Sequence, residues 1–177
     1  DEIVKPYFYD NTDKTKRLSP SVVQWEGIYE FEKGYGADWR YEKNWQYSGS
    51  DPIFAKYWQY ENGSYCGFVP VIRWSEMHYI AAEASVATDL QKAIHYVDTV
   101  RYNRYLRDFP LDKNLPEERV KEEIYKEYRK EMIGEGQLFY YYKRLRFTSI
   151  PGSAISGNDD VYVLPMPDNE IEFGNRK

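Results

Sequence analysis

The stretch between residues 39 and 47 alternates aromatic rings with polar side chains, a pattern suited to contact with a polar ligand. Sugar rings present apolar C–H faces that stack on an indole or a phenol, while neighbouring polar groups hydrogen-bond to the hydroxyls. The pattern therefore predicts a carbohydrate-binding surface made by six residues: Trp39, Arg40, Tyr41, Asn44, Trp45 and Tyr47. The alternative interpretation is that these rings fill the core of a loop-rich region, since Trp is usually highly buried.

Carboxylate pairs are plentiful, but their placement does not predict an active site. A glycosidase needs two carboxylates that face each other across a cleft. The acidic pairs of this chain lie along one expected helix, beside lysines and arginines. We therefore expect them to form a solvated, salt-bridged helix face, made by Glu122/Glu123, Glu127/Glu131 and Glu131/Glu135.

Metal and cofactor motifs are likewise not found in the sequence. His78 and His95 fall on different expected helices, with no second His or Cys at the spacing of metal ligands. Gly34-Tyr35-Gly36 lacks the third glycine and the βαβ setting of a dinucleotide-binding loop. We therefore expect a protein that is not an enzyme and has no catalytic residue, no cofactor and no metal.

Charge and composition narrow the classes of partner further. A net charge of −5 over 177 residues argues against a nucleic-acid partner, because surfaces that bind nucleic acid are basic. The single cysteine, Cys66, excludes an internal disulfide and is expected to be a small buried hydrophobe. No apolar run is long enough to span a bilayer, and the first residues lack the features of a signal peptide.

Three amphipathic helices are expected after residue 70, which makes the fold mainly α. The first covers Arg73–Ala87, the second covers Asp89–Leu106 with Thr88 or Asp89 as its cap, and the third begins near Pro116. Their expected buried faces are Met77, Ile80, Ala81 and Ala84; Leu90, Ala93, Ile94, Val97, Val100 and Tyr105; and Val120, Ile124, Tyr128 and Met132. Because almost nothing separates the first two helices, we expect an antiparallel hairpin like those of tetratricopeptide repeats (TPR-like).

Residues 1–70 form a loop-rich, aromatic-rich segment in this interpretation, and residues 71–177 form the helical region. Glycines and prolines punctuate the first segment, which also holds four of the five tryptophans. Short extended pieces are expected around Ile3–Phe8 and Trp25–Phe31. We expect the two segments to make one structural unit.

Several short motifs follow one another in an order typical of a single family. They are Asp38-Trp39-Arg40 with Lys56-Tyr57, then Pro70 with Arg73, Glu76 and Ala82-Glu83-Ala84, then Val97–Arg101, Glu131–Gly136 with Phe139-Tyr140, and Tyr162–Ile171. The last of these holds Leu164-Pro165-Met166-Pro167, in which two prolines keep the chain extended. Together the motifs resemble the C-terminal portion of the SusD/RagB family, over Asp38–Ile171.

The resemblance implies a non-catalytic, cell-surface lipoprotein of the outer membrane that serves polysaccharide utilisation. Such a protein captures an oligosaccharide or polysaccharide for import through a TonB-dependent, SusC-like transporter. Such a protein meets the membrane through a lipid anchor. We expect this chain to be a fragment without that anchor, because family members are longer. The alternatives are a helical-repeat protein-interaction module, a peptide-binding SusD homologue and, least favoured, a fragment of a glycoside hydrolase.

Overall fold

The structure, a computed structural model, describes residues 18–56 and 71–165. The chain divides into two compact units, Asp1–Gly134 and Glu135–Lys177. Residues 18–56 and 71–134 therefore share the first unit, while the expected boundary at residue 70 stays a prediction. Several features named above lie outside the described residues: Ile3–Phe8, Tyr57, Cys66, Pro70 and Met166–Ile171.

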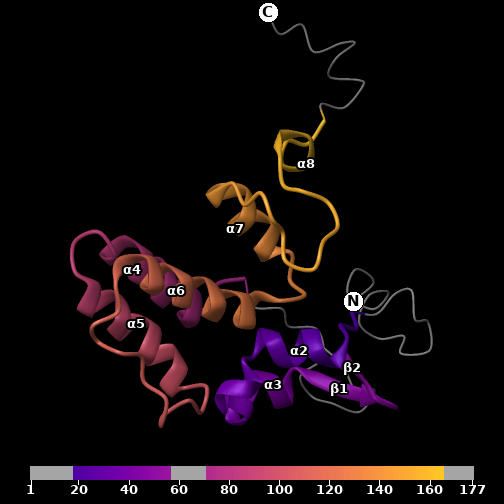
Figure 1. The fold of residues 1–177 in the computed structure, drawn as a ribbon, viewed down its shortest axis with the longest axis horizontal. Coiled ribbons are helices and arrows are strands. Elements are labelled where there is room, and N and C mark those ends of the chain that lie inside the picture. Colours follow the sequence, from indigo (N-terminus) through magenta and orange to yellow (C-terminus); the bar gives the residue numbers. More distant parts are fainter. Residues whose placement is uncertain (1–17, 57–70, 166–177) are drawn as a thin grey trace, which may run out of the picture. The chain divides into compact units, whose positions relative to one another are not determined.

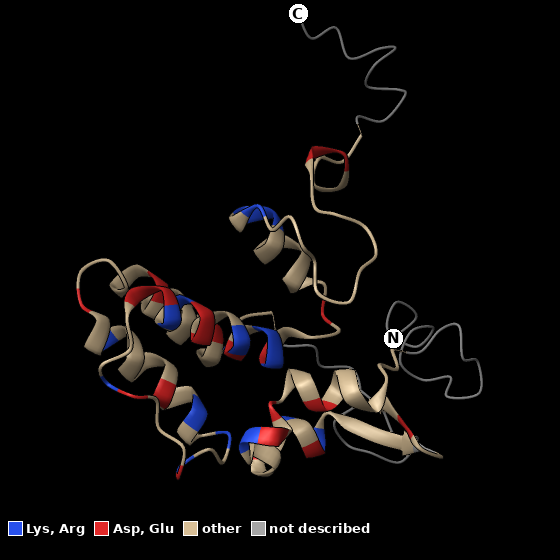
Figure 2. Ribbon diagram, viewed as in Figure 1, with Lys and Arg blue, Asp and Glu red and all other residues tan. Residues whose placement is uncertain are grey.

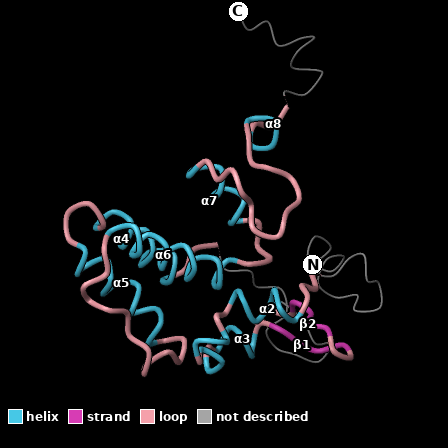
Figure 3. Tube along the Cα trace, viewed as in Figure 1, coloured by secondary structure: helices cyan, strands magenta, loops and turns pink. Residues whose placement is uncertain are grey.

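The described part of the chain is mainly helical, which confirms the predicted fold class (Figure 3). The first unit contains α2 (Val22–Ile28), the 3-10 turns η1 (Phe31–Lys33) and η2 (Tyr35–Ala37), α3 (Trp39–Lys43), β1 (Trp45–Ser48), β2 (Asp51–Phe54), α4 (Trp74–Ser85), α5 (Leu90–Tyr102) and α6 (Glu117–Met132) (Figure 1). The second unit contains α7 (Gln137–Leu145) and α8 (Asp159–Tyr162). The strands β1 and β2 pair in antiparallel register, with Trp45 opposite Phe54.

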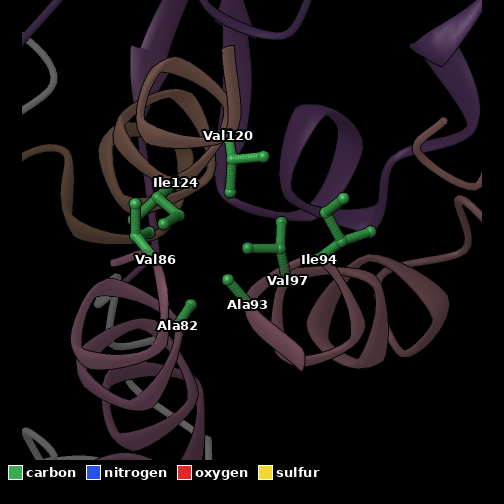
Figure 4. Close-up of a cluster of buried hydrophobic side chains, with 7 residues drawn as sticks. All are labelled: Ala82, Val86, Ala93, Ile94, Val97, Val120 and Ile124. Carbon is green, nitrogen blue, oxygen red and sulfur yellow. The ribbon is translucent and has the colours of Figure 1, made fainter. Parts of the chain in front are cut away.

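Helices α4 and α5 form the expected hairpin, and α6 packs against both. Their shared core is made by Ala82, Val86, Ala93, Ile94, Val97, Val120 and Ile124, which converge from the three helices (Figure 4). The side chain of Asp89 caps α5, because its Oδ1 accepts from the backbone N–H of Lys92 at 3.0 Å. The predicted apolar stripes are confirmed for the buried residues Ala93, Ile94, Val97, Val100, Val120, Ile124 and Met132. Leu90 and Tyr128 are half-buried, and Tyr105 lies beyond α5 and is exposed.

The buried face of α4 was predicted wrongly. Met77 and Ile80 are exposed, and the residues that face inward are Ser75, Tyr79, Ala82 and Ser85. The reason is that α4 packs partly against charged groups rather than against an apolar surface. Ser75 Oγ donates to Glu131 Oε1 at 3.1 Å, and the Tyr79 hydroxyl accepts from Arg40 Nη1 at 3.4 Å. Hydrophobic periodicity identifies an apolar stripe, and here the buried stripe is partly polar.

The segment Trp25–Phe31 is also different from the expectation, because most of it is helical. Ser21 starts α2 with a capping box: its Oγ accepts from the Gln24 backbone N–H at 3.2 Å, and Gln24 Oε1 accepts from the Ser21 backbone N–H at 3.1 Å. This cap places Trp25 and Ile28 on one inward face, three residues apart. Together with Tyr29, Trp45 and Phe54 they make a second, aromatic core.

The second unit consists of α7, the loop after it and the short helix α8. The loop is held by an isolated bridge between Ser149 and Ser156. Tyr162 anchors its end, because the buried ring donates its hydroxyl proton to the backbone carbonyl of Phe147 at 2.7 Å. Asn158 caps α8 by accepting from the Val161 N–H at 3.1 Å.

Candidate functional site

A buried cluster of charges surrounds Arg40 and fixes the segment that carries Trp39. Arg40 Nη2 donates to Asp38 Oδ2 at 2.7 Å and to Glu127 Oε2 at 2.6 Å, and Nη1 donates to Glu131 Oε2 at 3.4 Å. Asp38 also caps α3, because its Oδ1 accepts from the Arg40 backbone N–H at 2.9 Å. Arg40 is buried, so this predicted ligand contact faces the protein interior.

Glu127 and Glu131 on α6 each accept from several cations. Glu127 Oε1 accepts from Arg101 Nη1 at 2.8 Å and from Lys130 Nζ at 3.0 Å. Arg104 binds both oxygens of Glu131, through Nη2 to Oε1 at 2.8 Å and through Nε to Oε2 at 3.1 Å. Buried ions are tolerated when they are paired and hydrogen-bonded in this way.

The expectation of a solvated acidic face on α6 was therefore wrong for Glu123, Glu127 and Glu131, which are buried. It holds for the partly exposed Glu122, which pairs with Lys126 at 3.0 Å and with Arg119. Lys and Arg are interspersed with Glu along α6 (Figure 2). Only the tertiary arrangement decides which carboxylates meet α3 and α5.

The electrostatics of the cluster favour ionised carboxylates. Burial alone would raise the pKa of Glu131, but the hydrogen bond from Arg104 and the positive charges of Arg40 and Arg104 outweigh burial and lower this pKa to about 2. Burial alone would also raise the pKa of Glu30, but the positive charge and the hydrogen bond of Lys130 outweigh burial and lower this pKa to about 2. These carboxylates therefore stabilise the fold only while they carry their charge.

Acidification is expected to destabilise the protein mainly between about pH 4.5 and pH 2. Because the folded-state pKa of Glu131 is lowered from 4.5 to about 2, its contribution is present above the unfolded pKa and is lost as pH falls through the folded pKa. Denaturant midpoints measured at stepwise pH would show a decline over this range that is shallower in Glu131→Gln. A wild-type midpoint that stays constant from pH 4.5 to pH 2 would contradict this assignment.

The six predicted site residues do not form one surface. Tyr41, Trp45 and Tyr47 all contact Trp25, with ring centroids 4.0, 6.3 and 5.4 Å away. Arg40, Asn44 and Trp45 are buried, Tyr41 is half-buried, and Trp39 and Tyr47 are exposed. Trp45 belongs to the aromatic core, where its Nε1 donates to the Tyr29 hydroxyl at 2.9 Å. A ligand role for these six residues stays a prediction. The two exposed rings belong to different groups, because Tyr47 contacts Trp25 whereas Trp39 contacts Tyr105.

Trp39 belongs instead to an exposed group of rings at the end of α5. It stacks on Tyr105 with centroids 4.9 Å apart, and its backbone N–H donates to the Arg104 carbonyl at 3.1 Å. The Arg107 guanidinium lies 4.9 Å from the Tyr102 ring centroid and 5.0 Å from that of Tyr105. We call Trp39, Tyr102, Tyr105 and Arg107 the aromatic ridge; its rings are 47%, 55% and 48% exposed.

The end of α5 explains why Tyr105 faces outward. Tyr105 has φ of 67°, the left-handed conformation, and the next N–H, of Leu106, donates to the Arg101 carbonyl at 3.0 Å. This is the hydrogen bond of a Schellman motif, which reverses the chain after a helix. Leu106 is buried as a result, while Tyr105 stays on the surface. Aromatic rings and cations also occur together in the sequence Tyr102-Asn103-Arg104-Tyr105-Leu106-Arg107, as they do in residues 39–47. Sequence reasoning missed this signal.

Two clefts adjoin this region, and Arg104 lines both. One of about 140 Å³ is bordered by Trp39, Lys43, Lys56 and Arg104, with Arg40, Asn44 and Glu131 at its base. The other, of about 260 Å³, is bordered by Trp74, His78, Asn103 and Arg104. A flat ring beside a cleft with several hydrogen-bond donors is an arrangement that can hold a sugar, by stacking and by bonds to its oxygens.

Among residues 18–56 and 71–165, no group of three or more His, Cys, Asp or Glu side chains is placed to hold a metal ion. None of the helices described in those ranges combines the length and the apolar character needed to cross a membrane.

Comparison with known proteins gives one match. The family model described as SusD family matches residues 7–172, which is most of the chain. No curated protein and no solved structure matches the chain. The match contains every residue of the charge cluster, the aromatic ridge and both clefts.

Proposed function

The chain belongs to the SusD family, and from this premise we propose that it is a cell-surface protein that captures oligosaccharides for import through a TonB-dependent, SusC-like transporter. The family consists of non-catalytic binding proteins, so the chain is not an enzyme. SusD family proteins are outer-membrane lipoproteins. A lipid-anchored position at the cell surface is accordingly part of the proposal for this chain.

We place the oligosaccharide on the aromatic ridge, and one observation supports this choice above the others. Trp39 and Tyr105 come from different segments, yet they stack into one half-exposed pair next to cationic side chains. Stacking supplies affinity for the apolar face of a sugar, and Arg104 and Lys43 supply donors for its oxygens. Modest affinity suits this task, since a captured ligand must be released to the transporter.

A second candidate function, protein or peptide contact, is favoured by the outer face of α4. Trp74, Met77 and Ile80 are exposed there, together with Val71 and Ile72 just before the helix. Exposed apolar patches of this kind often mark contact surfaces for other proteins. Trp74 on this face also lines the larger cleft, together with Arg104.

Isothermal titration calorimetry against a panel of oligosaccharides and short peptides tests the proposal. We expect saturable binding of at least one oligosaccharide class, with no release of reducing ends from any of them. Binding of peptides without binding of any oligosaccharide would support the second candidate and overturn the first. Absence of binding to either class would overturn both placements of the ligand on this chain.

A further inference from the structure

The larger of the two clefts lies between the start of α4 and the end of α5. Trp74 and His78 are one turn apart on α4, so they share a helix face. Thr99 and Asn103 are likewise one turn apart where α5 ends. In an antiparallel hairpin the start of one helix lies beside the end of the other, and this brings the two pairs together. The hairpin itself therefore builds the cleft, which we call the hairpin cleft.

Trp74 gives the hairpin cleft a flat and accessible ring. It is 82% exposed and is the most exposed tryptophan among the residues that the structure describes. An indole in this position can bury apolar area on a ligand without rearranging the core, as it does when a sugar ring stacks on it. The cleft measures about 260 Å³, less than the roughly 300–1,000 Å³ of pockets that enclose a drug-sized ligand. It is therefore sized for one part of an oligosaccharide.

Hydrogen bonds in the wall of the hairpin cleft determine which polar atoms remain for a ligand. The Trp74 carbonyl can only accept, so His78 Nδ1, 2.8 Å away, carries a proton and donates to it. Nε2 of the neutral imidazole is then an acceptor, and an edge contact with the Tyr96 ring holds the imidazole in place. In the same way, Asn103 Nδ2 donates to the Thr99 carbonyl at 2.8 Å, which leaves Asn103 Oδ1 as an acceptor.

Arg104 adds donors to these acceptors. Its Nη2 and Nε donate to Glu131 at 2.8 and 3.1 Å, and among the described residues its Nη1 has no hydrogen-bond partner. A hydroxyl group both donates and accepts, so a wall that offers acceptors and donors together matches the hydroxyls of a sugar. Arg104 also lines the smaller cleft beside Trp39, which makes the two clefts neighbours.

We propose that the hairpin cleft is a second sugar subsite, in which Trp74 stacks on one sugar unit while His78 and Asn103 accept from its hydroxyls. The inference rests on the proposed function and deepens it, because it makes the ligand an oligosaccharide that extends from the aromatic ridge past Arg104 to Trp74. A ligand already held at one subsite meets the second at a high effective concentration, so engaging both raises its affinity.

Calorimetry on the full chain with oligosaccharides of increasing length tests the second subsite. The probes are cello-, xylo- and malto-oligosaccharides, each from the disaccharide to the heptasaccharide. In at least one series we expect Kd to fall about tenfold or more once the ligand is long enough to engage both clefts. This gain with length is the quantity to compare between variants, because a general loss of folded protein does not change the ratio of two Kd values.

Trp74→Ala removes the second stacking face at an exposed position, so the protein should stay folded. It is expected to cancel the gain with length, whereas Trp74→Phe keeps a flat ring and should retain most of the gain. Asn103→Ala removes one acceptor and should weaken binding of the longest member about three- to fivefold. Val23→Ala, 79% exposed on α2 and outside both clefts, is the matched control and should keep the full gain.

The outcomes separate this inference from the proposed function. If Kd does not depend on length, or if Trp74→Ala keeps the wild-type gain, the second subsite is overturned while oligosaccharide capture at the aromatic ridge stands. If Trp74→Ala removes binding of a short peptide and leaves the gain with length intact, Trp74 serves peptide contact and the subsite is likewise overturned. If no member of any series binds, the proposed function fails and the inference fails with it.

Discussion

Glu127→Gln is expected to destabilise the protein by about 3–5 kcal/mol, as is typical when one partner of a buried ion pair is removed. Glu127 is fully buried, and its two oxygens accept from Arg40, Arg101 and Lys130 at 2.6, 2.8 and 3.0 Å. The neutral amide keeps the size of the side chain but leaves three buried cations without their shared anion. It also turns an N–H₂ donor towards groups that can only donate.

The measurement is a pair of denaturant titrations with Glu118→Gln as the control. Glu118 lies on the same helix, but it is exposed and pairs only with the exposed Lys121 among the contacts described for it. Its replacement should leave the unfolding midpoint unchanged, because exposed ion pairs contribute little. Equal midpoints for Glu127→Gln and Glu118→Gln would show that the buried cluster does not support the fold.

The charge cluster bears on the proposed function because it sets the position of the aromatic ridge. Asp38 and Arg40 flank Trp39 in sequence, and both are locked to each other inside the protein. Arg104 is fixed to Glu131 and precedes Tyr105, the partner ring of Trp39. Groups that hold a ligand work best when the surrounding bonds keep them in place before the ligand arrives. The buried ions therefore act as positioning residues for an exposed ring pair.

Sequence reasoning predicted most of the buried face of α5 because that face is apolar, apart from Arg101, and packs against an apolar core. Ala93, Ile94, Val97 and Val100 recur with helical spacing and are all buried. The same reasoning chose the wrong face of α4. There the inward positions hold Ser75 and Tyr79, which look like surface residues until their charged partners on α3 and α6 are known.

The candidate site was predictable only in part, for a related reason. Trp39 was identified from its polar and aromatic neighbours, but the exposed ring it contacts, Tyr105, lies in a different segment of the chain. Glu127 and Glu131 have the i, i+4 spacing of an ordinary solvated pair. Their partner Arg40 lies 87 and 91 residues away in sequence, and local spacing carries no information about such a contact.

Trp39→Ala is expected to weaken oligosaccharide binding about tenfold or more, which corresponds to about 1.4 kcal/mol or more of binding free energy. The indole supplies the flat face on which a sugar ring stacks, and Tyr105 supports it from one side. Because Trp39 is about half exposed, the substitution should have a smaller effect on stability than Glu127→Gln. Trp39→Ala is thus expected to weaken oligosaccharide binding while the protein stays folded.

The most direct test of capture at the aromatic ridge is calorimetry of Trp39→Ala beside Tyr47→Ala, with the oligosaccharide that binds the wild type. Tyr47 is more exposed than Trp39, but its ring contacts Trp25 and belongs to the other group of rings. The ridge predicts that Trp39→Ala raises Kd about tenfold or more, whereas Tyr47→Ala keeps the wild-type Kd. Wild-type affinity in a folded Trp39→Ala, or a loss confined to Tyr47→Ala, would contradict the ridge as the site of capture.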